Sequence, residues 1–299
     1  TVTDAAGETD TETISITVVN TNDAPTGTVT ITGTATEDQV LTASNDIVDD
    51  DGVGTITYTW SNGDVGTTTT LGQSDVGNTI TVIASYNDVL GNNAESITSI
   101  ATTAVANIND DGIVTVNPQG AIMEDTELTA TIADEDGTTS STVTYQWSES
   151  SGGVTFTPIT GATTDKFTPL QVHVGQYLEL YLTYVDDFGQ SESFTVHFTG
   201  PVVNVNDAPV GTVTITGDAE EDKVLTASDD LTDEDGMGTV TYTWSNGDIG
   251  TTTILGQSDV GTTITVTASY TDGFGGSNAA TSAATTAVAN VNDLPTGAV

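Results

Sequence analysis

The sequence of 299 residues contains no cysteine and only two basic side chains, Lys166 and Lys223. Disulfide bonds, on which small extracellular domains often depend, are therefore excluded. Proteins that bind nucleic acids or anionic membranes use basic residues to displace counterions, and two lysines are too few for that role. No run of about 18 apolar residues is present, so no membrane-spanning helix is predicted. We therefore expect neither a nucleic-acid partner nor direct insertion into a membrane.

Acidic residues are abundant instead. There are 43 Asp and Glu residues, which give a formal net charge of −41, yet charged residues of both signs make up only 15% of the chain. Hydrophobic residues reach 35%, which is less than in an average globular domain. These values are typical of several small cores in one chain.

A polar phrase recurs along the chain and defines its organisation. It reads NTNDAPTG from residue 20, NINDDGIV from 107, NVNDAPVG from 204 and NVNDLPTG from 290. Repeats of about ninety residues are the size of a domain. We predict a carboxyl-terminal fragment of a preceding domain, three repeats of which the second is divergent, and the start of a further linker or domain: residues 1–21, 22–108, 109–205, 206–291 and 292–299. The sequence is thus expected to be an internal part of a longer protein.

The repeats have the sequence pattern of β-strands. Residues 27–33, 54–60, 78–86 and 96–107 alternate apolar residues with Thr or Ser, as expected for half-buried antiparallel strands. The Asn-Gly pair in WSNGD, from residue 60 and again from 244, predicts a two-residue type I′ hairpin turn. We predict an all-β fold of tandem seven-stranded β-sandwich domains arranged end to end. Trp60, Trp147 and Trp244 would anchor the cores; stacking on carbohydrate is the alternative.

The strand order places the acidic side chains at the two ends of each sandwich. In the first repeat, Glu37 and Asp75 are predicted at one end, and Asp49, Asp51 and Asp88 at the other. Each end faces an Asn-x-Asn-Asp linker. Two carboxylates about 5 Å apart repel by roughly 3 kcal/mol at an effective dielectric constant of 20, so a cluster of them requires a cation. Oxygen ligands favour Ca²⁺ over Zn²⁺ or Cu²⁺. The alternative is that these acids only solvate loop tips.

The linker, the Asp-x-Asp-Gly loops and the Asp-x-x-Gly sequences before the last strands resemble the calcium-binding junctions of cadherins. Their combination with EDxxLTA, YxW and DVGxxITV resembles, more specifically, the Ig-like or cadherin-like repeats of giant bacterial adhesins with RTX-type carboxyl termini. The resemblance covers almost the whole chain. It implies a stalk whose junctions are stiffened by Ca²⁺, with neighbouring repeats of the same chain as partners, in a monomer at the outer surface of a bacterium.

The same resemblance implies a set of metal ligands at three junctions. At the amino-terminal junction they are Asn22, Asp23, Asp49, Asp51 and Asp88. Between the first and second repeats they are Glu37, Asp75, Asn107, Asn109, Asp110, Asp134, Asp136 and Asp186. Between the second and third repeats they are Glu124, Asn204, Asn206, Asp207, Asp233, Asp235 and Asp272. Because His173 stands where the other repeats have Asp75 and Asp259, the middle junction is expected to hold fewer ions.

An enzymatic function is not predicted. The only imidazoles are His173 and His197, and neither lies in a known catalytic motif. Paired carboxylates recur identically in the first and third repeats, whereas an active site requires a single asymmetric cleft. The alternative function is a glycan- or protein-binding site on the second repeat, which carries the insertion-like segment 148–167.

Overall fold

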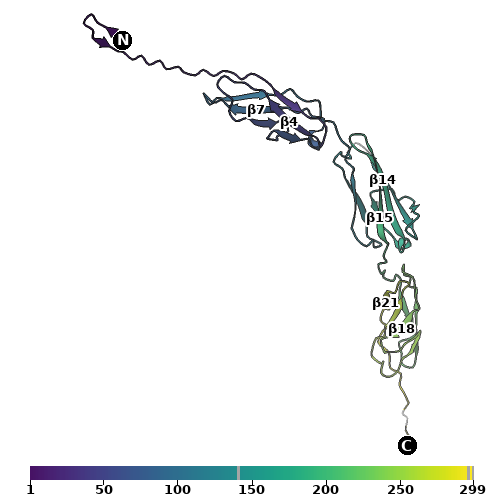
Figure 1. The fold of residues 1–299 in the computed structure, drawn as a ribbon. Helices are drawn as coiled ribbons and strands as arrows, with labels where there is room; N and C mark the ends of the chain where they lie inside the picture. The colour runs from purple at the N-terminus through teal and green to yellow at the C-terminus, as the bar shows by residue number, and fades with distance from the viewer. Residues whose placement is uncertain (140–141, 295–296, 298–299) are drawn as a thin grey trace. The chain divides into compact units, whose positions relative to one another are not determined.

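The computed structural model describes residues 1–139, 142–294 and 297, so part of the predicted final segment, residues 292–299, lies outside the described residues. The described part is built from β-strands and two 3₁₀ turns and contains no α-helix (Figure 1). It divides into two compact units. One contains residues 1–113 with the loops at 133–139 and 185–192, and the other contains the remaining described residues. None of the described segments is a helix long and apolar enough to cross a membrane.

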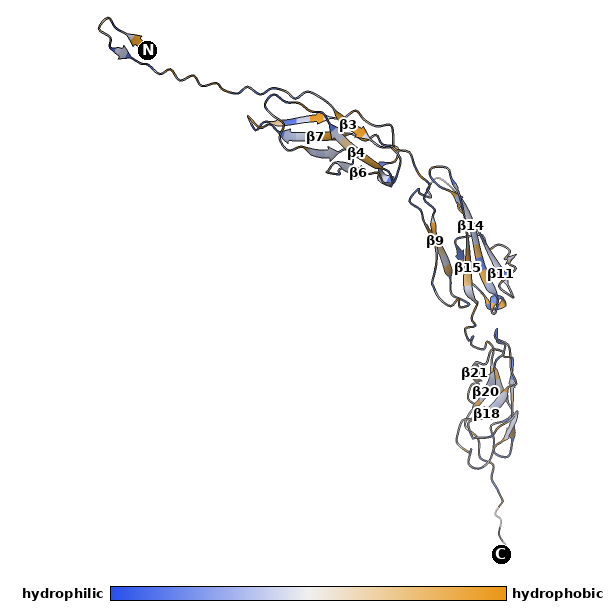
Figure 2. Ribbon diagram, in the orientation of Figure 1, coloured by the Kyte–Doolittle hydropathy of each residue, from blue (hydrophilic) through white to orange (hydrophobic). Residues whose placement is uncertain are grey.

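The first sandwich consists of two three-stranded antiparallel sheets. One sheet has the order β3-β4-β6 and the other the order β5-β7-β8. The strands are β3 (Val29–Thr32), β4 (Val40–Asn45), β5 (Thr57–Trp60), β6 (Thr68–Thr70), β7 (Val82–Asn87) and β8 (Ala94–Thr98). Buried and exposed positions alternate along β4 and β7, so each strand turns one face to the interior. Figure 2 shows hydrophobic and hydrophilic residues mixed along the strands of this sandwich. Leu41 of the first sheet and Trp60 and Val82 of the second belong to one hydrophobic cluster.

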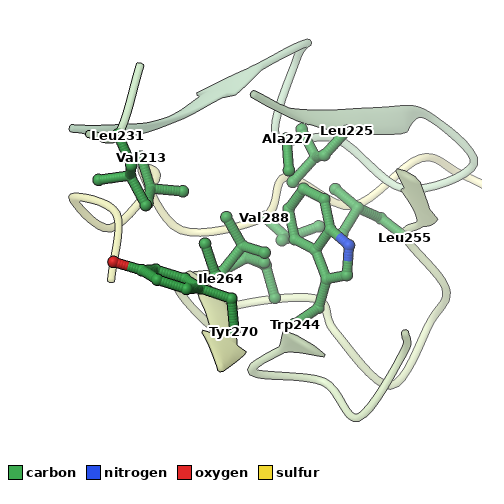
Figure 3. Close-up of a cluster of buried hydrophobic side chains, with 11 residues drawn as sticks. Val213, Leu225, Ala227, Leu231, Trp244, Leu255, Ile264, Tyr270 and Val288 are labelled. Atoms are coloured by element: carbon green, nitrogen blue, oxygen red, sulfur yellow. The ribbon is translucent and has the colours of Figure 1, made fainter. Parts of the chain in front are cut away.

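The third sandwich repeats this arrangement, as its near-identical sequence predicts. Its sheets have the orders β16-β17-β19 and β18-β20-β21. The strands are β16 (Val213–Thr216), β17 (Val224–Asp229), β18 (Thr241–Trp244), β19 (Thr252–Ile254), β20 (Val266–Thr271) and β21 (Ser277–Thr281). Figure 3 shows Trp244 packed among Leu225, Ala227 and Leu255, while the hydroxyl of Tyr270 points away from this cluster.

Among the described residues the middle sandwich has seven strands, because the segment 148–167 adds β12 to one of its sheets, while β13 is the counterpart of β6 and β19. The sheets have the orders β13-β10-β9 and β12-β11-β14-β15. The strands are β9 (Ile113–Asn117), β10 (Leu128–Ala133), β11 (Thr144–Ser150), β12 (Thr157–Pro158), β13 (Lys166–Phe167), β14 (Tyr177–Val185) and β15 (Ser191–Pro201). β12 pairs with β11, and β13 pairs with β10. The segment considered as a binding surface therefore extends the sandwich itself.

The three tryptophans lie in the cores, as predicted. Trp60, Trp147 and Trp244 are 2%, 0% and 2% exposed. Each indole Nε1 donates a hydrogen bond to a main-chain carbonyl, that of Gly66 (2.9 Å), Thr164 (3.0 Å) or Gly250 (2.9 Å). A buried indole with its only donor satisfied inside the fold cannot stack on a carbohydrate. The all-β sandwich prediction and the core role of these residues are confirmed.

The predicted two-residue hairpin turn is wrong. The amide of Trp60 donates to the carbonyl of Asp64 (2.8 Å) and the amide of Gly63 donates to the carbonyl of Trp60 (3.0 Å), so the loop contains three residues. Gly63 is left-handed at φ 99°, and no positive φ occurs at Asn62 as a type I′ turn requires. The Asn62 side chain instead donates to Thr69 Oγ1 (3.0 Å) and Asp75 Oδ2 (3.3 Å), which holds the longer loop against the sandwich.

The predicted strand at residues 96–107 is interrupted. β8 ends at Thr98, and the hydroxyls of Ser99 and Thr102 accept hydrogen bonds from the amides of Val82 and Ile80, both at 3.0 Å. Side-chain oxygens thus take the place of carbonyl oxygens and break the regular ladder. Residues 104–106 then form isolated bridges, two of which are parallel. Continuous strands number six in the first sandwich and six in the third, among the residues that the structure describes.

The first residues of the chain form a small hairpin, β1 (Val2–Thr3) and β2 (Thr9–Asp10). Asp4 Oδ1 accepts hydrogen bonds from the amides of Ala6 (2.9 Å) and Glu8 (3.0 Å). The Asp-x-x-Gly loops before the last strands of the second and third sandwiches are closed in the same way, as described below. The loop type expected for this segment is therefore present, while its origin in a preceding domain stays a prediction.

Candidate metal centres

Two groups of three carboxylates stand out among the described residues. The first carboxylate group consists of Glu37, Asp110 and Asp136, and the second consists of Glu124, Asp207 and Asp235. In each group, one oxygen from every residue lies within 4.8 Å of the others. Each group draws its members from three separate segments of the sequence: a turn before a repeat's second strand, a linker and an Asp-x-Asp-Gly loop.

The glutamates are the most deeply buried members. Glu37 is 2% exposed and Glu124 is 1% exposed. Glu37 Oε2 accepts a hydrogen bond from the amide of Ile108 (3.1 Å), and Glu124 Oε1 accepts one from the amide of Val205 (2.6 Å). Each glutamate therefore binds the main chain of the linker about seventy to eighty residues further on, which fixes the start of the linker beside the turn.

The Asp-x-Asp-Gly loops hold their second aspartate by the same contacts in each case. The amide of Asp136 donates to Asp134 Oδ1 (2.8 Å), and Asp136 Oδ2 accepts from the amide of Asp110 (2.8 Å). In the second group, the amide of Asp235 donates to Asp233 Oδ1 (2.9 Å), and Asp235 Oδ2 accepts from the amide of Asp207 (2.8 Å). One oxygen of the loop aspartate is thus occupied by the linker, and the other is buried without a hydrogen-bond donor.

The amino-terminal loop is built in the same way. The amide of Asp51 donates to Asp49 Oδ1 (2.9 Å), and Asp51 Oδ2 accepts from the amide of Asp23 (2.8 Å). Tyr86 donates its hydroxyl to Asp49 Oδ2 (2.6 Å), and Tyr270 does the same for Asp233. These tyrosines, which the sequence alone did not single out, hold the first aspartate of the loop and so orient the second.

Several oxygens of the two groups are buried without a hydrogen-bond donor. They are Oδ1 of Asp136, Oδ1 of Asp235 and Oδ2 of Asp207. Asp136 and Asp235 are 1% and 3% exposed, so water does not readily replace the missing partner. A buried, unpartnered carboxylate oxygen is costly unless a cation neutralises it. The atoms available as metal ligands are all hard oxygens, which fits Ca²⁺ and does not fit Zn²⁺ or Cu²⁺.

The electrostatic environment reflects this crowding of negative charge. Burial raises the pKa of the Glu37 carboxyl, and the charges of Asp110 and Asp136 raise it further, against the hydrogen bond from Ile108. The pKa of Glu124 is raised in the same way, first by burial and then by Asp207 and Asp235. Asp110 and Asp207 also have raised pKa values, chiefly because of burial. Without a cation, each group therefore opposes ionisation of its own members.

The raised pKa values of these carboxyl groups predict how the stability of the protein depends on pH in the presence of a chelator. A raised pKa in the folded state means that stability is lost as pH rises through that pKa and regained as pH falls towards the unfolded value. We therefore expect the melting temperature in EDTA to increase between pH 7 and about pH 5. Scanning calorimetry at several pH values measures it. In saturating Ca²⁺ the trend should disappear or reverse, because protons then compete with the ion. A melting temperature in EDTA that is constant over this range would contradict the prediction.

The remaining predicted aspartates close turns. The amide of Gly72 donates to Asp75 Oδ2 (3.1 Å), and the amide of Leu170 donates to His173 Nδ1 (2.9 Å) at the equivalent place. His173 thus performs the capping role of Asp75, and the substitution removes no contact of this kind. Asp75 does not belong to the first carboxylate group.

The loops before the last strands are capped likewise. Asp186 Oδ1 accepts from the amides of Phe188 (2.8 Å) and Gln190 (2.9 Å), and Asp272 Oδ1 accepts from those of Phe274 (2.9 Å) and Gly276 (2.8 Å). Asp88 accepts from the amide of Gly91 (2.6 Å). Burial alone would raise the pKa of Asp88, but hydrogen bonds from Asn93 and Gly91 leave it lowered. These caps shape the loops beside the linkers, and their role as ligands stays a prediction.

The linker asparagines contact residues that sequence reasoning missed. Asn22 Nδ2 donates to Glu95 Oε1 (2.9 Å), Asn109 Nδ2 to Glu192 Oε1 (3.1 Å) and Asn206 Nδ2 to Asn278 Oδ1 (3.1 Å). Glu95, Glu192 and Asn278 all lie at the start of the last strand, six or seven residues after the capping aspartate. Their common position as the second residue of the last strand was the available signal, but only an alignment of the divergent loops would have revealed it.

The first linker asparagine of two phrases, Asn204 and Asn290, accepts a hydrogen bond from a glutamine, Gln171 or Gln257. Gln171 Nε2 donates to Asn204 Oδ1 (3.2 Å), while Oε1 of Gln73 and Oδ1 of Asn107 are buried without a donor. These neutral oxygens border the junctions and add ligand capacity of the type that Ca²⁺ accepts. Glu221, also absent from the predicted set, accepts from the amide of Val291 (3.1 Å) as Glu37 and Glu124 do from their own linkers.

No family model matches the chain, and no curated protein is significantly similar to it. Among solved structures, the chain is similar to a tetra-tandem repeat in the extending region of a large adhesion protein, with 22% identity, coverage of 89% of this chain and 76% of that chain, and a TM-score of 0.25. It is also similar to a Ca²⁺-stabilised, ice-binding adhesin of an Antarctic bacterium, with 20% identity, coverage of 96% and 80%, and a TM-score of 0.27. A segment of titin matches with 13% identity, coverage of 89% and 99%, and a TM-score of 0.31.

The first of these structures belongs to a large adhesion protein, and the second to an adhesin of an Antarctic bacterium.

Proposed function

We propose that the chain is a non-catalytic structural extender of a large bacterial surface adhesin, and that Ca²⁺ bound by the two carboxylate groups stiffens its linkers. The observation that carries the proposal is the pair of buried aspartates, Asp136 and Asp235, each of which belongs to a group of three carboxylates and has a buried oxygen without a hydrogen-bond donor. A divalent cation supplies the missing charge. The two lysines offer no substitute, since Lys166 pairs with Glu127 (2.5 Å) on the surface and Lys223 is exposed.

The mechanism is mechanical. In each group the ion is coordinated by a turn, a linker and a loop that lie far apart in the sequence. Binding one ion to all three segments removes the conformational freedom of the linker, whereas three uncompensated carboxylates push the segments apart. A series of such joints would hold a ligand-binding region away from the cell. Extracellular modules bind Ca²⁺ at ~10⁻⁴ to 10⁻³ M, a concentration that external fluids provide and the cytosol does not.

The histidines support a non-catalytic role. His173 accepts the hydrogen bond of a turn amide. His197 Nδ1 lies 3.2 Å from Glu179 Oε2 on the face of neighbouring strands. Both imidazoles therefore have structural partners, and neither adjoins the carboxylate groups. The alternative of a binding site on the middle repeat is tested by screening the whole chain against glycans, where a specific hit would add a second role.

Small-angle scattering of the chain in EDTA and in millimolar Ca²⁺, with calorimetric titration of the same sample, tests the proposal. We expect at least two ions to bind, and the maximum dimension and the stiffness to increase. Binding without any change in the scattering profile would leave calcium sites but reject the stiffening mechanism. If no ion binds and the profile is unchanged, the acidic ends only solvate the loops and the proposal fails.

A further inference from the structure

The two carboxylate groups are built from the same three kinds of residue, a turn glutamate, a linker aspartate and a loop aspartate, but their surroundings differ. At the first group, the linker asparagine Asn109 contacts the carboxylate of Glu192; at the second, Asn206 contacts the neutral amide of Asn278, and both distances are 3.1 Å. Glu192 and Asn278 are 9% and 7% exposed, so each is buried beside its linker. The buried side chain next to the first group thus carries a full negative charge, and its counterpart next to the second group carries none.

At two further positions the first group also has an acidic neighbour where the second group has a neutral one. The linker aspartate of the first group is followed by Asp111, whereas that of the second is followed by Ala208. In the loop before the last strand, the amide of Asp187 donates to the carbonyl of Asp136 (3.3 Å), and the equivalent amide donating to Asp235 is that of Gly273 (3.0 Å). Three acidic residues, Glu192, Asp111 and Asp187, therefore stand in the segments that adjoin the first group, where the second group has Asn278, Ala208 and Gly273.

The contact made by Asn278 shows that the neutral side chain is built into the second group. Asn278 Nδ2 donates to Asp272 Oδ2 (2.8 Å) while its Oδ1 accepts from Asn206. An amide can make both contacts at once, but a carboxylate would lack the donor for Asp272. The exchange of Glu for Asn is therefore a coordinated difference between the two junctions.

The consequence follows from the charge dependence of calcium binding. Ligand charge tunes the affinity of protein calcium sites over several orders of magnitude, and an added buried charge is screened less than one in solvent. We propose that the buried residue at the start of the last strand, Glu192 or Asn278, sets the calcium affinity of each group, so that the first group fills at a lower Ca²⁺ concentration than the second. This inference rests on the proposed function. The linker at 107–111 would then stiffen before the linker at 204–208 as Ca²⁺ rises.

The order of filling is measured by calorimetric titration of the whole chain with one group removed at a time. Asp235→Asn leaves the first group intact, and Asp136→Asn leaves the second. We expect the first group to bind about tenfold more tightly or better. Equal affinities in the two variants would overturn the inference while leaving the proposed function in place. If neither variant nor the unmodified chain binds Ca²⁺, the proposed function itself fails.

The role of Glu192 and Asn278 is measured by replacing the charged side chain with a neutral one and the neutral side chain with a charged one. In the Asp235→Asn chain, Glu192→Gln keeps an oxygen for Asn109 and should weaken binding about tenfold. Glu135→Gln, which removes an exposed charge from the loop that carries Asp136, is the control and should change affinity less than about twofold. In the Asp136→Asn chain, Asn278→Glu should strengthen binding. If that variant fails to fold, Glu192→Gln alone decides, and a change no larger than that of the control would overturn the inference.

Discussion

Replacing Asp235 by Asn is expected to weaken Ca²⁺ binding at the second carboxylate group by about a hundredfold or more, because a charged ligand becomes neutral with almost no change of shape. The hydrogen bond from the amide of Asp207 can be kept by the new side-chain carbonyl, so the loop should retain its conformation. A ligand at a hundred times its dissociation constant stabilises a fold by ~2.7 kcal/mol. The variant should lose a stabilisation of this size in Ca²⁺.

The measurement is chemical unfolding of the whole chain in saturating Ca²⁺ and in EDTA, followed by tryptophan fluorescence. In EDTA the same variant should be as stable as the unmodified chain or more stable, since one member of a repelling group has lost its charge. This reversal separates loss of a metal site from simple damage to the fold. Asp218→Asn, an exposed acid of the same repeat, is the control and should show neither effect. Destabilisation of the Asp235 variant to the same extent in both media would contradict the prediction.

Replacing Trp147 by Ala should destabilise the middle sandwich by roughly 3–5 kcal/mol, the usual cost of removing a large buried aromatic side chain. Trp147 is fully buried, and its ring stacks with those of Phe167 and Phe198 at centroid distances of 5.4 Å and 6.1 Å. The deletion also leaves the carbonyl of Thr164 without its indole donor. This cost is a large fraction of the ~5–15 kcal/mol by which domains are usually stable.

Urea unfolding followed by circular dichroism, with Trp60 and Trp244 as fluorescent reporters of the other two cores, measures the effect. We expect an early transition from the middle sandwich and nearly unchanged transitions for the reporters. Tyr181→Ala, on β14 of the same sandwich but 45% exposed, should cost far less. If Trp147→Ala left the unfolding curve unchanged, the indole would not be the anchor of this core.

The alternation of apolar residues was sufficient to predict the sheets and the buried tryptophans, because period-two burial is a local property of a strand. It failed where side chains replaced main-chain groups. No pattern in residues 96–107 indicates that the hydroxyls of Ser99 and Thr102 accept hydrogen bonds that carbonyl oxygens accept in a regular β-ladder. The Asn-Gly turn failed for a similar reason, since the engagement of Asn62 by Thr69 and Asp75 is a tertiary contact.

For the candidate metal centres, too, part was predicted from the sequence and part was missed. The recurring motifs, and the resemblance that they carry, named all six members of the two carboxylate groups: the linker and the Asp-x-Asp-Gly loop supplied four, and the Glu-Asp turn supplied Glu37 and Glu124. The equivalence of Asp75 and His173 as turn caps was not predicted, because a carboxylate and an imidazole share no sequence signal for accepting one amide hydrogen. The contacts of Glu95, Glu192 and Asn278 with the linkers were missed because the loops before them differ in sequence and length.

The sequence by itself determined the class of the fold, the repeat and the choice of oxygen ligands, since these follow from local periodicity, recurrence and residue chemistry. Only the tertiary structure decided which carboxylates meet, because Glu37 and Asp136 are about a hundred residues apart in the chain and come together through the packing of a turn against a linker and a loop. It also decided which acids cap turns and which keep a buried oxygen without a hydrogen-bond donor. That distinction depends on where main-chain amides point, and residue identity alone does not specify it.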